Sequence, residues 1–195
     1  MCHGELVEPL PKGKQIEVMN PSYQLRIMKS LFTILMLFVL GSQSFAQDYA
    51  SFDEMKNEII SKTIPLISVQ DLKKVENTKI PLVILDAREK NEYHVSHIKK
   101  ALHVGYENFN IKALKEVDKK NTIVIYCSVG YRSEKIAQKL KKSGFTKVLN
   151  LQGGIFEWVN ECYPVYDNKG NETQKIHAYN ESWGKWLTKG EKVYE

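Results

Sequence analysis

The sequence predicts an α/β fold, an open parallel sheet of five strands with helices on both faces, followed by a C-terminal hairpin and helix. Short apolar runs alternate with amphipathic stretches along residues 51–160, which is the pattern of parallel strands joined by crossover helices. Residues 82–85 are continuously apolar, as expected of a strand buried on both faces. The hydrophobic fraction of 43% and charged fraction of 26% are typical of globular proteins.

The elements follow this pattern in order. Ser51 and, three residues later, Glu54 form a capping-box signature that predicts a helix over 51–60. Apolar runs predict strands at residues 66–68, 81–86, 101–104, 122–126 and 147–151. Helical spacing of apolar residues predicts helices at residues 69–75, 111–117, 134–142 and 155–159. Gly144 is the expected stop signal after the helix at 134–142.

Residues 163–195 are expected to form an appendage to the domain at 47–162. The turn-rich run 167–171 lies between 164–166 and 173–176, which predicts a hairpin. After it, four large apolar residues recur at helical spacing: Tyr179, Trp183, Trp186 and Leu187. We expect this aromatic helix to pack on the chain's own surface, with partner binding as the alternative.

The N-terminal residues indicate export. Residues 28–46 combine a basic start, an apolar stretch from 31 to 40 and small residues ending at Ala46, which predicts a cleaved signal peptide. The apolar stretch is shorter than the roughly 20 residues that span a bilayer, so no membrane anchor is expected after cleavage. Residues 1–27 are interpreted as an upstream leader, with Met28 or Met19 as the true start. The predicted location is the periplasm or the exterior.

Charge gives little sign of a nucleic-acid partner. The formal net charge is +5, and the lysine pairs are spread along the chain instead of forming one stripe. We therefore expect no nucleic-acid binding.

Cys127 is the candidate reactive residue. It follows the apolar run 122–126 and leads into a helical pattern, and such a strand–loop–helix junction directs backbone N–H groups and positive charge to one point. Arg132 adds a fixed positive charge, so we expect a thiolate at neutral pH or below. The alternative is a buried, inert cysteine.

Three blocks of sequence resemble the rhodanese-like sulfurtransferases over about residues 66–162. The blocks contain Asp86-Ala87-Arg88-Glu89 with Glu92-Tyr93 and His97-Ile98, then Tyr126-Cys127-Ser128-Val129-Gly130-Tyr131-Arg132-Ser133, and lastly Gly144-Phe145 with Leu151-Gln152-Gly153-Gly154-Ile155 and Trp158.

This resemblance implies that Cys127 takes sulfane sulfur from a thiosulfate-like donor, forms a persulfide and passes the sulfur to cyanide or a thiol, including a possible protein thiol. No cofactor and no metal are implied. The expected anion-binding loop is Ser128, Val129, Gly130, Tyr131 and Arg132, whose backbone N–H groups can form a cradle. Arg132 either helps to bind the anion or braces the loop through Asp86 or Glu134. Asp86 and Arg88 are expected to form a polar tie beneath the loop, with Ser133 as a further supporting residue.

Three questions stay open at this level. The spacing Cys-x4-Arg gives a six-residue loop, one residue shorter than in the fold's phosphatase relatives, which favours a sulfurtransferase over a small phosphatase or arsenate reductase. A sulfur-carrier or protein-binding module with little turnover is the main alternative function. Cys162 is a second thiol that could resolve the persulfide or form a disulfide with Cys127.

Overall fold

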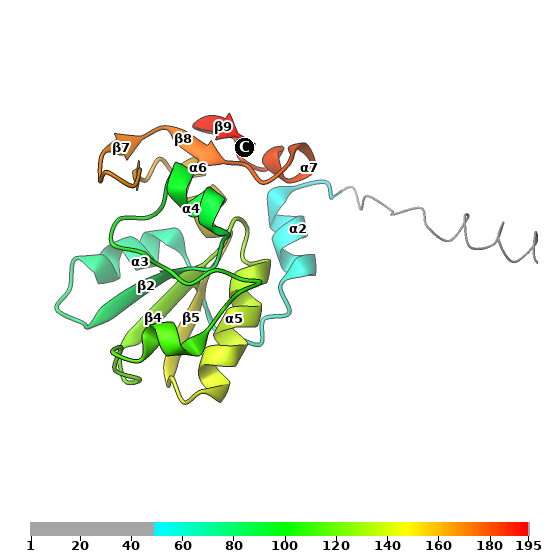
Figure 1. Cartoon of the computed structure of the whole chain (residues 1–195). Coiled ribbons are helices and arrows are strands. Elements are labelled where there is room, and N and C mark those ends of the chain that lie inside the picture. The colour runs from blue at the N-terminus through cyan, green and yellow to red at the C-terminus, as the bar shows by residue number, and fades with distance from the viewer. Residues whose placement is uncertain (1–48, 195) are drawn as a thin grey trace, which may run out of the picture. The chain divides into compact units, whose positions relative to one another are not determined.

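The computed structural model describes residues 49–194, and these residues contain a five-stranded parallel sheet (Figure 1). The strand order is β1-β5-β4-β2-β3, and each neighbouring pair is parallel. The strands are β1 (Leu66–Ile67), β2 (Leu82–Asp86), β3 (Leu102–His103), β4 (Thr122–Tyr126) and β5 (Lys147–Leu151). The predicted α/β class with a parallel sheet of five strands is confirmed.

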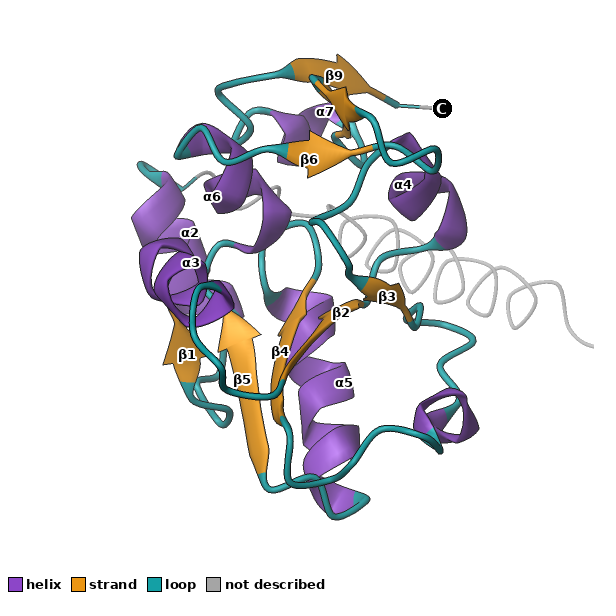
Figure 2. Cartoon of the chain, turned by 90° about the vertical axis from the view of Figure 1, so that its left-hand side faces the viewer, coloured by secondary structure: helices purple, strands orange, loops and turns teal. Residues whose placement is uncertain are grey.

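Helices cover both faces of this sheet, as predicted. They are α2 (Phe52–Ile59), α3 (Val69–Glu76), α4 (Lys90–Val95), the 3-10 turn η1 (Ile111–Leu114), α5 (Tyr131–Lys142) and α6 (Gly154–Asn160). Val124 and Tyr126 of β4 pack into one core with residues of α2, α3 and α6. Ile123 and Ile125 pack in a second core with residues of α5, and Figure 2 shows α5 next to β4. The alternation follows from the two-residue period of a strand.

Most predicted boundaries agree with the structure to within a few residues, with two differences. The stretch 111–117 forms only the short turn η1. The Asn110 side chain caps the start of this turn by accepting the backbone N–H of Lys112. Helix α4 was not predicted, because its sequence Lys-Asn-Glu-Tyr-His-Val has no apolar periodicity. Its first turn is held locally instead, since the Glu92 carboxylate accepts the backbone N–H of Glu89 at 2.9 Å.

The C-terminal segment contains the expected hairpin and a second small sheet that was not expected. Strand β6 (Val165–Tyr166) pairs antiparallel with β7 (Glu172–Thr173) around the predicted turn. Strand β8 (Lys175–His177) pairs parallel with β9 (Glu191–Val193), so the predicted strand 173–176 is divided between two sheets.

The predicted aromatic helix is wrong in extent. Helix α7 (Glu181–Gly184) is only one turn long. Its last residue, Gly184, packs closely against Tyr194, because a Cβ added at Gly184 would lie 2.8 Å from the Tyr194 hydroxyl. Leu187 is fully buried, and Trp186 stacks on Phe52 with ring centroids 5.8 Å apart, so this part packs on the chain's own surface. Tyr179 lies before the helix, with a backbone φ of +69°.

The predicted leader at 1–27 and signal peptide at 28–46 lie outside the described residues. Within residues 49–194, no helix has the length and apolar character needed to cross a membrane.

Candidate active site

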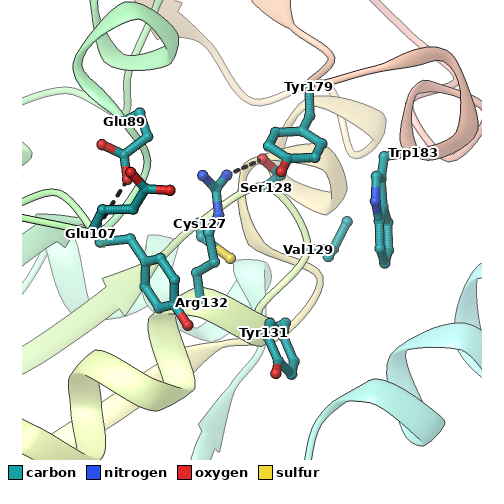
Figure 3. Close-up of a pocket in the computed structure, with 10 residues that line it drawn as sticks. Glu89, Glu107, Cys127, Ser128, Val129, Tyr131, Arg132, Tyr179 and Trp183 are labelled. Atoms are coloured by element: carbon teal, nitrogen blue, oxygen red, sulfur yellow. Dashed lines mark hydrogen bonds between the residues drawn. The ribbon is translucent and has the colours of Figure 1, made fainter. Parts of the chain in front are cut away.

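Cys127 lies directly after the C-terminal end of β4, near the middle of the sheet. It is 1% exposed and contributes to a cavity of about 320 Å³ (Figure 3). In parallel α/β sheets, ligands bind at the carboxyl ends of the strands. Cys127 therefore lies where a ligand bound to this sheet would be expected.

The loop from Cys127 to Arg132 bends back over the sulfur. Gly130 has a φ of +110°, which L side chains rarely adopt, and its N–H donates to Cys127 Sγ at 3.2 Å. The Ser133 hydroxyl lies 3.6 Å from the same sulfur. The Ser133 proton is donated to Asn150 at the shorter distance of 2.7 Å, so the Gly130 N–H is the hydrogen bond that the sulfur accepts.

Asn150, a buried residue of β5, holds the loop that begins at Cys127 in place. Its amide nitrogen donates to Gly130 O at 2.9 Å, and its side-chain oxygen accepts from Ser133 Oγ at 2.7 Å. Sequence reasoning missed this residue, because it belongs to a strand 20 residues further along the chain.

The start of α6 holds the loop from another side. Ile155 N donates to Cys127 O at 2.9 Å, and Phe156 N donates to Ser128 O at 3.1 Å. Gly154 permits this approach, since a Cβ there would collide with Cys127 O. The glycine pair at 153–154 is the feature of the sequence that could have indicated this close contact.

Arg132 braces the loop, but neither predicted carboxylate is its partner. Its two Nη atoms donate to the Glu92 carboxylate at 2.6 and 2.7 Å, and Nη2 also donates to Ser128 Oγ at 3.0 Å. The predicted partners are occupied elsewhere: Asp86 pairs with Arg88, and Glu134 accepts the backbone N–H groups of residues 61 and 63. Glu92 was missed as a partner because it lies in the unpredicted helix α4.

This ion pair shifts both groups toward their charged forms. Burial alone would raise the pKa of Glu92, but the hydrogen bonds and charge of Arg132 outweigh burial and hold that pKa below its usual range. Burial would likewise lower the pKa of Arg132, and Glu92 reverses the effect so that it is raised. Both side chains are therefore charged at neutral pH.

Asp86 and Arg88 form the expected polar tie, and both are fully buried. Arg88 Nη2 donates to Asp86 Oδ2 at 2.7 Å and to the Ser96 carbonyl at 2.6 Å. Neither residue lines the cavity, so their contribution is to hold the ends of β2 and α4 together.

The cavity walls come from segments far apart in the sequence. Besides loop residues 127–129, 131 and 132, the cavity is lined by Glu89, Tyr106, Glu107, Tyr179 and Trp183. The Tyr179 ring centroid lies 5.1 Å from Arg132 Cζ, within the range of a cation–π contact. The C-terminal segment thus contributes a wall of the candidate site, which its sequence did not reveal.

Cys162 is separate from this site. Cys127 and Cys162 are both free thiols, the first buried and the second exposed. Cys162 lines a different cavity and lies 3.0 Å from Lys189 Nζ. The structure contains no disulfide between the two thiols.

His97 Nδ1 lies 3.1 Å from the Tyr93 carbonyl oxygen, a contact that links this residue to the end of α4. Among residues 49–194, no group of three or more His, Cys, Asp or Glu side chains could hold a metal ion.

Known proteins resemble this chain in sequence and in fold. Residues 68–161 match a family model described as a rhodanese-like domain. The chain is 35% identical over 101 residues to the putative sulfur carrier protein YrkF of Bacillus subtilis, covering 52% of this chain and 54% of that protein. It is 37% identical over 85 residues to a tRNA uridine(34) hydroxylase of an Enterobacter species, covering 41% of this chain and 24% of that protein.

The chain therefore spans about half the length of the first relative and a quarter of the second. Among solved structures, the BH2092 protein of Bacillus halodurans is similar with a TM-score of 0.51 and 25% identity, over 60% of this chain and 88% of that one.

Proposed function

The chain belongs to the rhodanese-like family through residues 68–161, and from this premise we propose that it transfers sulfane sulfur through a persulfide on Cys127. The observation that carries the proposal is the sulfur's position, at the head of a six-residue loop and beneath a cavity of about 320 Å³. Such chemistry needs a thiolate nucleophile, and the Gly130 N–H lies 3.2 Å from Sγ as a hydrogen-bond donor to it.

The reaction has two steps that balance without an added oxidant. The Cys127 thiolate attacks the outer sulfur of a thiosulfate-like donor, the donor's S–S bond breaks, and sulfite leaves with the electron pair. The resulting persulfide is then attacked by a thiol or cyanide, which takes the outer sulfur and returns Cys127 to the thiolate.

The second candidate function is a sulfur carrier that holds the persulfide with little turnover. It is favoured by the similarity to a protein named as a putative sulfur carrier, and by the 1% exposure of Cys127, which restricts access of bulky acceptors. A small phosphatase stays disfavoured by the six-residue loop from Cys127 to Arg132.

Mass measurement tests the proposal. After incubation with thiosulfate, we expect the intact mass of the protein to rise by one sulfur atom and to return when cyanide or a thiol is added. Cys127→Ser should abolish the adduct, whereas Cys162→Ser, the matched change at the exposed thiol, should keep it. An adduct that persists with acceptor present would support the carrier, and no adduct on Cys127 would refute both functions.

We also propose that the protein is exported to the periplasm or beyond, with residues 1–46 removed. The basic start, short apolar stretch and small residues before Gln47 support this proposal. We expect the intact mass of the exported protein to correspond to a chain that begins at Gln47. Retention of Cys2 in that exported form would contradict it.

A further inference from the structure

The cavity above Cys127 carries uneven charge. Glu89 and Glu107 lie at one end of it, and Tyr179 and Trp183 lie at the other (Figure 3). Glu107 N donates to Glu89 Oε1 at 3.2 Å, which fixes the two residues next to each other. Two carboxylates thus face the space that a sulfur donor or acceptor must enter.

No lining cation is available to balance them. Among the described residues that line the cavity, Arg132 carries the only positive charge. Both of its Nη atoms are engaged by Glu92, and the Tyr179 ring covers its guanidinium, with the ring centroid 5.1 Å away. An anionic group placed beside Glu89 and Glu107 would therefore meet two carboxylates and no unpaired lining cation.

Besides Cys127, Ser128 and Val129, the rest of the wall is aromatic and is formed by Tyr106, Tyr131, Tyr179 and Trp183. The faces of such rings attract cations, most strongly where water is excluded. Carboxylates at one end and the Tyr179 and Trp183 rings at the other favour a small cationic group on an apolar stem, and they disfavour an anionic group beside the two carboxylates.

Building on the proposed sulfur transfer, we propose that the cavity selects a sulfur acceptor whose thiol carries a positive charge close to the sulfur, with Glu89 and Glu107 as the specificity-determining residues. The cation comes either from a small aminothiol or from a basic residue beside a cysteine in a peptide. The acceptor thiolate attacks the outer sulfur of the Cys127 persulfide, a new S–S bond forms, and the old bond's electron pair stays on Cys127 Sγ. The acceptor leaves as a persulfide, with no net oxidation.

Three thiols that differ in charge test this inference: cysteamine, 2-mercaptoethanol and 3-mercaptopropionate. The protein is loaded with thiosulfate and desalted, and the rate of persulfide loss is followed with each thiol. Each rate in the variant is divided by the wild-type rate for the same thiol, which cancels differences in intrinsic reactivity. We expect Glu107→Gln with Glu89→Gln to slow transfer to cysteamine about three- to five-fold, because one screened ion pair is lost.

The same double variant should leave the rate of transfer to 2-mercaptoethanol nearly unchanged and raise the rate of transfer to 3-mercaptopropionate. The matched control, Glu58→Gln with Glu191→Gln, removes the same charge at exposed positions outside the cavity and should change none of the ratios. Glu107→Lys is a second variant, for the case that Glu89→Gln perturbs α4. The Glu107 side chain is exposed, so this change should leave the fold intact. It should reverse the preference between cysteamine and 3-mercaptopropionate.

Two capped peptides, Gly-Cys-Lys and Gly-Cys-Glu, distinguish the sources of the cation. If the lysine peptide is preferred, and this preference is lost in the Glu89 and Glu107 variant, the cation belongs to a peptide. If the preference is seen with cysteamine alone, the cation belongs to a small aminothiol. Persulfide that forms but transfers without regard to charge would overturn this inference and leave the proposed function intact. No persulfide on Cys127 would overturn both.

Discussion

Replacing Asp86 with alanine is expected to lower the free energy of unfolding by about 3–5 kcal/mol. The reason is that Arg88 is fully buried and depends on Asp86 for charge balance, through Nε at 3.1 Å and Nη2 at 2.7 Å. Without the carboxylate, the guanidinium keeps only the Ser96 carbonyl as a hydrogen-bonding acceptor for Nη2. Denaturant unfolding of the purified protein measures the loss.

Asp53 provides the matched control for this change. It pairs with Lys56 at 2.8 Å, nearly the same distance, but its side chain is 84% exposed. Asp53→Ala should therefore cost at most about 1 kcal/mol. Adding Arg88→Met to Asp86→Ala should recover part of the lost stability, because no unpaired buried charge is left. A cost for Asp86→Ala as small as that for Asp53→Ala would contradict the argument.

The parts of the fold that sequence predicted are those determined by local apolar patterns. The strands β4 and β5 begin and end at the predicted residues, since each is a continuous or alternating apolar run between polar boundaries. Helix α4 lacks such a pattern. It is stabilised by the Glu89–Glu92 contact in its first turn and by the tertiary ion pair with Arg132, neither of which has an apolar period.

The same distinction applies to the candidate site. Cys127, Gly130 and Arg132 lie within six residues, so their loop could be inferred from one stretch of sequence. Glu92 and Tyr179 lie 40 and 47 residues from Arg132 and reach it only through the folded sheet and the C-terminal segment. A single sequence gives no pairing information for such distant side chains, and both carboxylates proposed for Arg132 were wrong for that reason.

Replacing Glu92 with alanine is the second change expected to cost about 3–5 kcal/mol in free energy of unfolding. The carboxylate is almost fully buried and accepts from both Nη atoms of Arg132, from Ser128 Oγ at 3.2 Å and from the backbone N–H of Glu89. Its loss leaves the positive charge of Arg132 half-buried and unpaired beside Cys127. Thermal or denaturant unfolding would show the change, and Glu191→Ala, at an exposed glutamate 3.9 Å from Lys175, is the control.

The pH dependence of stability separates loss of the Glu92 charge from loss of packing. Because the pKa of Glu92 is lowered in the folded protein, its charge stabilises the fold above the pKa of an unfolded glutamate, about 4.3, and this contribution disappears as pH falls through the lower folded pKa. Glu92→Gln keeps the size of the side chain and removes the titration. The difference in unfolding free energy between wild type and Glu92→Gln should therefore be constant near neutral pH and shrink on acidification below about pH 4.3. A difference that does not change between neutral and acid pH would show that the Glu92–Arg132 ion pair contributes nothing through its charge.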